Sequence, residues 1–290
     1  MEKKKKGILD FAEMKKNGEK ITFITSYDYH MAAFSERAGL DMLLVGDSLG
    51  MTVYGYSSTI PVKMDQMIYH AEAVRRGAPN TFVIGDMPFM SYQKSWEEAV
   101  DNAGRFYKEA GCDAIKLEGG VRVCDQIQAI TDAGMLVMGH IGLTPQSTGQ
   151  FGGYKAQGYT AESAMQLIED ALAVQDAGAF ALLLEAVTPK VAGVITRMLD
   201  IPVLSIGAGP ECDGQLIIVH DILGIFEAFT PRFVKRYASI GDEMVRAIGE
   251  YAREVREGVF PGPEHTYLMK KGEFARLEEM LADMQKNEEE

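Results

Sequence analysis

The chain has 290 residues, and its 42 acidic and 29 basic side chains give a formal net charge of −13. This sign excludes a general nucleic-acid binder, because neutralising phosphates requires a basic surface. Hydrophobic residues make up 47% and charged residues 24%, which is typical of a globular protein and excludes a largely disordered one.

Apolar stretches and cysteines indicate the compartment. The longest apolar stretch, Ala177–Leu184, is too short for a bilayer, which needs about 20 residues. The basic opening, Met1–Lys6, leads into no apolar segment of the kind that export signals contain. The cysteines Cys112, Cys124 and Cys212 form no Cys-x-x-Cys pair, which fits a reducing environment. We expect a cytoplasmic protein with no membrane partner.

A recurring pattern predicts helix ends followed by strands. In each copy a polar residue and an Ala-Gly pair precede an apolar run that ends on a polar or charged residue. The Gly suits the left-handed residue that ends a helix, and a continuous apolar run suits a strand buried on both faces. The four copies start at Arg37, Glu109, Asp132 and Asp176 and lead to Asp47, Glu118, His140 and Glu185.

About eight strands follow from the apolar runs. We predict them at Ile21–Thr25, Met42–Val45, Phe82–Ile84, Ala114–Leu117, Leu136–Met138, Phe180–Leu184 and Val203–Ile206, with an eighth near Ile217–Val219 or Gly224–Phe226. Helices are expected between them, with start signals such as Ser95 and the Thr188-Pro189 pair. This alternation favours a (β/α)8 TIM-type barrel over an open doubly wound sheet, because no Gly-x-Gly-x-x-Gly turn follows the first strand.

The two ends lie outside this scheme. We expect one barrel domain over residues 1–269, including a Lys-rich N-terminal extension, and an acidic helical tail over residues 270–290. Apolar residues at helical spacing would let the tail pack on the barrel or on a neighbour; they are Phe274, Leu277, Met280, Leu281 and Met284.

Polar residues that close the strands are the candidate site, because the active sites of such barrels lie at the carboxyl ends of the strands. Four of these strand-closing residues are acidic: Asp47, Asp86, Glu118 and Glu185. Their carboxylates repel one another unless a cation lies among them or some are protonated. Oxygen ligands without a Cys or His cluster suit Mg²⁺, and Asp47, Asp86 and Glu118 are the natural set. Any one of these acids could instead merely cap a helix.

Lys116 lies two residues before Glu118 and therefore faces the same side of its strand. It could pair with a neighbouring carboxylate, form a Schiff base or hold the carboxylate of a substrate, and we favour substrate binding. Glu185 ends an apolar strand, and such surroundings favour proton uptake, so it is a candidate base, with a simple ion pair as the alternative.

Three further features remain open. Ser48 offers a hydroxyl beside Asp47 or caps a turn. His140 has small neighbours and could be structural or catalytic. The Gly-rich stretch Ile206–Pro210 suggests a loop shaped for a substrate.

Longer motifs run through the predicted barrel. They are VGDSLGM at 45–51, MIYHAEAVRRGAPN at 67–80, GDMPFMSYQ at 85–93, AIKLEGG at 114–120, GHIGLTPQ at 139–146, GGYKAQG at 152–158, AGAFALLLE at 177–185, IGAGPECDGQ at 206–215 and HDILG at 220–224. Together they resemble the ketopantoate hydroxymethyltransferase family. Residues 148–151 and the tail depart from the family pattern.

The resemblance implies a Mg²⁺-dependent barrel of the phosphoenolpyruvate/pyruvate type. Such an enzyme of pantothenate biosynthesis transfers a one-carbon unit from 5,10-methylenetetrahydrofolate to 3-methyl-2-oxobutanoate through a Mg-stabilised enolate, giving 2-dehydropantoate and tetrahydrofolate. Carried onto this chain, Asp47, Asp86 and Glu118 bind the metal, Ser48 and Lys116 join Asp47 and Asp86 in holding the oxoacid, and Glu185 is the base. The family also implies a homo-oligomer, commonly a decamer.

Two other functions stay open. A Mg²⁺-dependent carbon–carbon lyase of the isocitrate lyase and phosphoenolpyruvate mutase type would share the enolate and need no folate. A catalytically silent folate-binding or assembly barrel is disfavoured by the presence of all four acids, Asp47, Asp86, Glu118 and Glu185.

Overall fold

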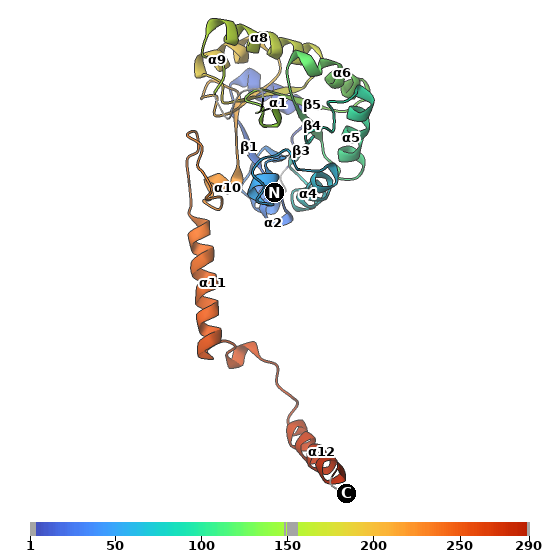
Figure 1. Cartoon of the computed structure of the whole chain (residues 1–290), viewed down its shortest axis with the longest axis vertical. Helices are drawn as coiled ribbons and strands as arrows, with labels where there is room; N and C mark the ends of the chain where they lie inside the picture. The colour runs from blue at the N-terminus through green and yellow to red at the C-terminus, as the bar shows by residue number, and fades with distance from the viewer. Residues whose placement is uncertain (1–3, 148, 150–155, 289–290) are drawn as a thin grey trace. The chain divides into compact units, whose positions relative to one another are not determined.

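The computed structural model describes residues 4–147, 149 and 156–288 (Figure 1). The start of the GGYKAQG motif, residues 152–155, lies outside the described residues, as do most of the positions 148–151 that depart from the family pattern.

Eight parallel strands form a closed barrel, in which each strand pairs with the next along the chain and β8 pairs with β1. This confirms the predicted (β/α)8 fold. The strands are β1 (Ile21–Thr25), β2 (Met42–Val45), β3 (Phe82–Asp86), β4 (Ala114–Glu118), β5 (Val137–Gly142), β6 (Ala181–Glu185), β7 (Val203–Ile206) and β8 (Gly214–Ile217).

Helices surround the barrel (Figure 1). Within the first 238 residues they are α1 (Ile8–Asn17), α2 (Tyr29–Arg37), α3 (Leu49–Thr52), α4 (Met64–Gly77), α5 (Trp96–Lys108), α6 (Cys124–Asp132), α8 (Ala161–Asp176), α9 (Pro189–Met198) and α10 (Val219–Ile222). Short 3-10 turns cover Val121–Val123 and Pro145–Ser147, and a third lies further along at Pro263–His265.

The recurring Ala-Gly pairs end helices as predicted. Gly39, Gly111, Gly134 and Gly178 follow α2, α5, α6 and α8 with φ angles of 87°, 66°, 86° and 98°. This left-handed conformation is unfavourable for a residue with a Cβ atom, so the four glycines fix where each helix turns back into the next strand.

The eighth strand differs from the prediction. β8 runs from Gly214 to Ile217, so it shares only Ile217 with the predicted range Ile217–Val219 and lies before the other predicted range, Gly224–Phe226. The outward residue Gln215 is polar and exposed, so this strand contains no continuous apolar run from which it could be predicted. The strict alternation also fails here, because the described loop 207–213 joins β7 to β8 without a helix.

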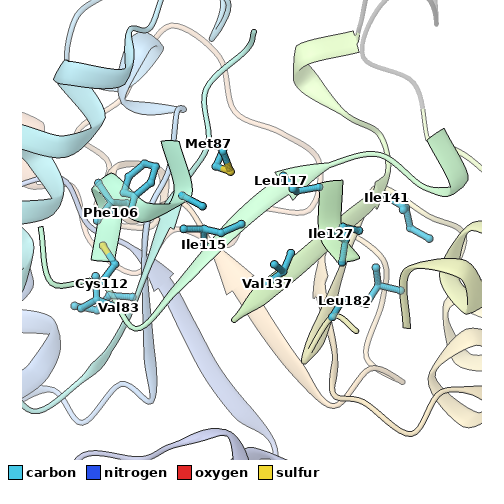
Figure 2. Close-up of a cluster of buried hydrophobic side chains, with 14 of the residues drawn as sticks. Val83, Met87, Phe106, Cys112, Ile115, Leu117, Ile127, Val137, Ile141 and Leu182 are labelled. Carbon is cyan, nitrogen blue, oxygen red and sulfur yellow. The ribbon is translucent and has the colours of Figure 1, made fainter. Parts of the chain in front are cut away.

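Side chains alternate between two layers along the strands, as the period of two of a β-strand requires. Outward residues such as Val83, Ile115 and Leu182 pack against the helices in one buried cluster (Figure 2). Inward residues form a second cluster in the lower barrel, which includes Phe82 and Leu183. Towards the carboxyl ends of the strands, the inward positions become charged.

The N-terminal helix α1 packs against the barrel. Its Phe11 is fully buried and meets the ring of Phe82 edge to face, with 5.2 Å between ring centroids. Lys15 of α1 lies 2.8 Å from Asp213, whose carboxylate also accepts a hydrogen bond from the N–H of Val203. The interior is thus filled with side chains below the level of the charged residues.

The described chain separates into two compact units, residues 1–238 and 239–290. The second unit contains α11 (Ile240–Glu257) and α12 (Glu273–Glu288), so a helix lies where we predicted the tail. The predicted domain boundary after residue 269 stays a prediction, and the division after Ala238 places α11 with the second unit. No helix among the described residues is long and apolar enough to cross a membrane.

Two glycine substitutions test how tightly the layer between the strands and the helices is packed. A Cβ atom at Gly85 in β3 would lie 2.2 Å from the Phe106 ring of α5, whereas one at Gly104 of the same helix would meet no atom within 4 Å. We expect Gly85→Ala to lower the free energy of unfolding by about 1–3 kcal/mol, because the ring must move in a packed layer. Gly104→Ala should leave stability unchanged or raise it by up to about 1 kcal/mol.

Denaturant unfolding of both variants tests this expectation. Equal stability of Gly85→Ala and the parent chain would show that the layer is not tightly packed at this point.

Candidate active site

The sequence-predicted site residues all line one cavity of about 430 Å³ at the carboxyl ends of the strands. Each belongs to the inward layer or to the turn that follows a strand. They are Asp47 and Ser48 after β2, Asp86 on β3, Lys116 and Glu118 on β4, His140 on β5 and Glu185 on β6.

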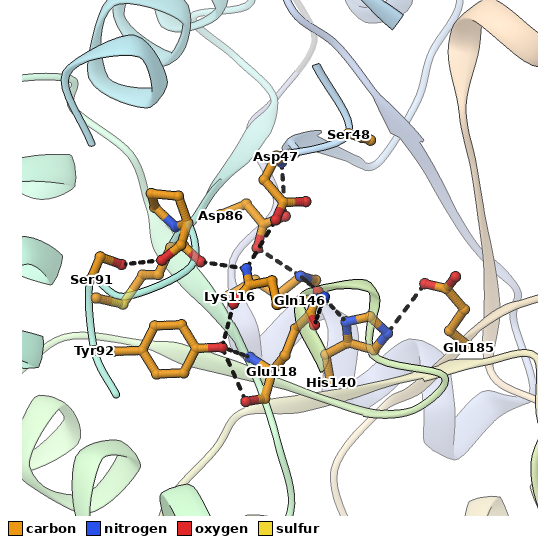
Figure 3. A network of polar contacts seen from close by, with 12 residues as sticks. Asp47, Ser48, Asp86, Ser91, Tyr92, Lys116, Glu118, His140, Gln146 and Glu185 are labelled. Atoms are coloured by element: carbon orange, nitrogen blue, oxygen red, sulfur yellow. Dashed lines mark hydrogen bonds and ion pairs between the residues drawn. The ribbon is translucent and has the colours of Figure 1, made fainter. Parts of the chain in front are cut away.

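Lys116 lies at the centre of the buried charges (Figure 3). Its Nζ is 2.6 Å from Oδ1 of Asp86 and 3.7 Å from Oε1 of Glu118. The ammonium therefore has carboxylate partners within the chain. Pairing with a neighbouring carboxylate was one of the roles that the sequence left open for Lys116. Burial opposes the charge, but the carboxylates of Asp86, Glu118 and Asp47 outweigh it and raise the pKa of Lys116.

Asp47 completes the acidic group. Its backbone N–H donates to Oδ2 of Asp86 at 3.0 Å, and its own carboxylate accepts from Nε2 of Gln146 at 2.9 Å. Burial, with the charges of Asp86 and Glu118, raises the pKa of Asp47 well above its usual range. Burial raises the pKa of Asp86 as well, although Lys116 opposes this, whereas Lys116 and His140 overcome burial and lower the pKa of Glu118.

Two residues of this network were missed in the sequence. Gln146 donates through its backbone N–H to Glu118 and through its side chain to Asp47 and to the carbonyl of Met87. The Tyr92 hydroxyl donates to Oε1 of Gln146 at 2.8 Å. Both residues lie inside the GHIGLTPQ and GDMPFMSYQ motifs, but neither closes a strand, so the search for strand-closing residues passed over them.

His140 connects two acids. Its Nδ1 lies 3.5 Å from Oε1 of Glu118, and its Nε2 lies 3.3 Å from Oε2 of Glu185. Burial and the charge of Lys116 lower the pKa of His140, but Glu118 and Glu185 outweigh them and raise it to about 9. His140 thus lies between two carboxylates that favour its protonated form.

Ser48 follows Asp47 in the turn after β2 and lines the same cavity. It precedes α3, but its side chain makes no capping hydrogen bond to that helix. Its hydroxyl instead lies 2.8 Å from the hydroxyl of buried Tyr27. The Ser48 side chain therefore does not cap α3, which was the other role that the sequence left open. Ser48 remains next to Asp47, one of the buried acids.

The donor set suits a divalent cation at two of the three predicted ligands. Asp47 and Asp86 are adjacent buried carboxylates whose raised pKa values show that their charged forms are disfavoured, and a bound cation would compensate those charges. Mg²⁺ commonly binds through one or two carboxylates plus water and substrate. Glu118 is already engaged by Gln146, Lys116 and His140. In the described part of the chain, no three His, Cys, Asp or Glu side chains converge on a common metal position.

Removing the Lys116 ammonium should destabilise the fold. We expect Lys116→Met to lower the free energy of unfolding by about 3–5 kcal/mol at pH 8 without added metal, because three carboxylates lose their buried partner. The loss should shrink towards pH 5, since the carboxylates then take up protons. A carboxyl group whose pKa is raised by folding destabilises the folded state only at pH values where the group is ionised.

A surface lysine provides the control. Lys94, 58% exposed and paired with Glu98 at 3.1 Å, should change stability by no more than about 0.5 kcal/mol when replaced by Met. A Lys116→Met deficit as small as this, or one that does not depend on pH, would contradict the charge argument.

The barrel has relatives of known structure. It resembles phosphonopyruvate hydrolase solved with oxalate and Mg²⁺, with a TM-score of 0.59 and 14% identity over 96% of this chain and 97% of the other. It also resembles 2,3-dimethylmalate lyase, a member of the phosphoenolpyruvate mutase and isocitrate lyase superfamily, with a TM-score of 0.56 and 18% identity over 97% and 99%. At sequence identities of 14% and 18%, these similarities show a shared fold only.

Sequence relatives are much more similar. The chain is 60% identical to the 3-methyl-2-oxobutanoate hydroxymethyltransferase of Alkaliphilus metalliredigens over 94% of its own length and 98% of the relative's. It is 52% identical to that of Geobacillus kaustophilus, with the same two coverages of 94% and 98%. The model of the ketopantoate hydroxymethyltransferase family matches residues 5–263. The chain belongs to the ketopantoate hydroxymethyltransferase family.

Proposed function

We propose that this protein transfers a hydroxymethyl unit from 5,10-methylenetetrahydrofolate to 3-methyl-2-oxobutanoate, forming 2-dehydropantoate and tetrahydrofolate. The observation that carries the proposal is the convergence in one cavity of paired buried acids, a buried lysine and a separate glutamate. The relatives named for this activity align with nearly the whole chain.

The charged end of the cavity would receive the oxoacid. Asp47 and Asp86 would hold Mg²⁺, which when bound supplies Lewis-acid stabilisation of negative charge on a chelating oxoacid. Lys116 lies 2.6 Å from Asp86 and would present its remaining N–H donors to the substrate carboxylate. Ser48 offers a further hydroxyl on the same side of the cavity.

Glu185 would remove the methine proton next to the oxoacid carbonyl. Its side chain is 16% exposed and lines the cavity at the end of β6, apart from the acids bound to Lys116. His140, whose Nε2 lies 3.3 Å from Oε2 of Glu185, would hold the Glu185 carboxylate in place. A carboxylate held in this way can take the proton as a general base.

Atoms balance with one water. The methine carbon loses its proton and forms a bond to the methylene carbon of the folate, and both carbon–nitrogen bonds of that methylene break. Water supplies the hydroxyl oxygen and its proton. The other water proton and the methine proton complete the two N–H groups of tetrahydrofolate.

The first experiment follows the methine proton of 3-methyl-2-oxobutanoate by NMR in deuterium oxide, with and without Mg²⁺, before adding methylenetetrahydrofolate. We expect metal-dependent exchange and then folate-dependent formation of dehydropantoate. Exchange without product would favour the lyase alternative, and no exchange under any condition would contradict the proposed chemistry.

Substitution of the proposed base separates binding from proton transfer. We expect Glu185→Gln to reduce the exchange rate by about 100-fold or more, since general-base catalysis contributes roughly 10²–10⁴-fold. Mg²⁺-dependent binding of the oxoacid should change little, as measured by calorimetry. Glu211→Gln, at an exposed glutamate paired with Arg197, is the control and should leave both unchanged. Undiminished exchange in Glu185→Gln would remove Glu185 from this role.

We also propose that the chain acts as a cytoplasmic homo-oligomer, with the family's decamer as the expected size. Sedimentation equilibrium at micromolar concentration measures this directly. A monomer in that experiment would contradict the proposed assembly.

A further inference from the structure

The cavity has a second part that the oxoacid does not need. Its volume of about 430 Å³ falls in the range that holds drug-sized ligands, which is far more than a small branched oxoacid fills. The charged residues described above lie on β3 to β6 and in the turn after β2. Residues 218–233, which follow β8, line the cavity with mostly apolar and aromatic side chains.

Aromatic side chains form the wall of this second part. Phe226 and Phe229 meet edge to face, with 5.4 Å between ring centroids. Phe229 is 50% exposed and Phe233 is 39% exposed, so both still have ring surface that a flat ligand could cover. Unpaired aromatic faces at a cavity are a favourable surface for stacking.

The Gly-rich loop after β7 determines where one of these rings lies. A Cβ atom at Gly207 would lie 2.5 Å from Cδ1 of Phe233, so this ring occupies the space that a side chain at position 207 would fill. The stretch Ile206–Pro210, which we predicted to be shaped for a substrate, thus packs against the aromatic wall.

One acid in this part of the cavity has no role in the chemistry described above. Asp221 on α10 is only 6% exposed and lines the cavity, yet no hydrogen bond to its carboxylate exists within the described chain. Burial raises the pKa of Asp221 to about 6, although Arg236 opposes the shift. An acceptor at the cavity wall with no donor in the described chain is available to the N–H groups of a ligand, and covering it without a donor would cost free energy.

We propose that Asp221 and the aromatic residues Phe226, Phe229 and Phe233 form the subsite for the pteridine ring of the folate co-substrate. Asp221 accepts hydrogen bonds from the ring's amino group and adjacent N–H, while the phenyl rings cover its faces. This inference rests on the proposed function, because that function supplies the folate.

The chemistry of the ring matches these side chains. A 2-amino-4-oxopteridine presents two neighbouring N–H donors on one edge, and a carboxylate accepts such a pair with two oxygens. Its bicyclic face suits phenyl rings. Arg232 lines the cavity, is exposed, and would attract the negatively charged glutamate tail.

The position of Asp221 also suits a donor that must meet the oxoacid. Tyr27 is hydrogen-bonded to Ser48 beside Asp47, and its ring centroid lies 5.3 Å from that of His220, the residue before Asp221. Ser48 and Asp221 both line the cavity, so Asp221 lies near Ser48. A pteridine bound there lies next to the proposed oxoacid position.

Folate binding and folate-independent proton exchange together test the subsite. We expect Asp221→Asn and Phe229→Ala each to weaken tetrahydrofolate binding, measured by anaerobic calorimetry, by about tenfold or more. The KM for methylenetetrahydrofolate should rise in parallel. The rate of Mg²⁺-dependent methine exchange without folate and the affinity for the oxoacid should remain within about twofold of the parent, since neither variant touches the charged end.

Matched controls come from the same kinds of residue outside the cavity. Glu227→Gln removes an exposed carboxylate from the same segment, and Phe34→Ala removes an exposed ring on α2. Neither should change folate binding. Phe229 is half exposed, so its variant keeps the test valid if replacement of buried Asp221 impairs folding.

The outcomes distinguish the two proposals. Parent-like tetrahydrofolate affinity in both Asp221→Asn and Phe229→Ala would overturn the subsite while leaving the proposed function intact. Absence of methine exchange in the parent protein would instead overturn the proposed function. Loss of exchange together with folate binding in the two variants would show a general structural effect and would also overturn the subsite.

Discussion

The buried ion cluster around Lys116 is the interaction on which the site depends. A single ammonium, 3% exposed, compensates carboxylates from three elements, and it can do so only because parallel strands bring its partners to one level of the barrel. Glu118 and Glu185, on either side of the His140 ring, raise its pKa to about 9 and so favour a second positive charge there. The position of each charge therefore follows from the register of β3 to β6.

That register is determined by packing rather than by the charges. Outward residues such as Val83 and Ile115 bury against helices, and a shift of one residue would turn each strand's buried set into the barrel interior. The same alternation directs Lys116 and Glu118 inward together. The apolar layer thus provides the free energy that holds an electrostatically unfavourable group in place.

Much of this could be predicted from the sequence. The Ala-Gly pairs, the apolar runs and the polar residue at the end of each run depend on local physics. The helix-ending Gly39 and the bounds of β2 were therefore predicted correctly, and β3 and β4 extend beyond the predicted apolar runs to Asp86 and Glu118, the acids expected to close them. What was missed depends on the tertiary structure. Gln146 and Tyr92 become part of the site only when the turns after β5 and β3 meet, and β8 is defined by pairing with β1 and β7 rather than by an apolar run.

The role of His140 also lay beyond the sequence. Its two contacts, to Glu118 and Glu185, come from neighbouring strands, and nothing in the chain around position 140 specifies them. The apolar run that it closes located the residue but left its chemistry open. Its protonation follows from the two distances to the acids, which only the folded arrangement provides.

The raised pKa values imply a definite link between pH, stability and binding. Asp47, Asp86 and Asp221 have raised pKa values, so the folded chain binds protons that the unfolded chain has released, and this contribution to stability falls as pH rises. The raised pKa of His140, about 9, acts in the same direction, since its stabilisation is lost as pH rises through that value. Glu118, with a lowered pKa, opposes the trend. A cation at Asp47 and Asp86 would displace their protons, so it would bind more tightly as pH rises, where the unliganded cluster is least stable.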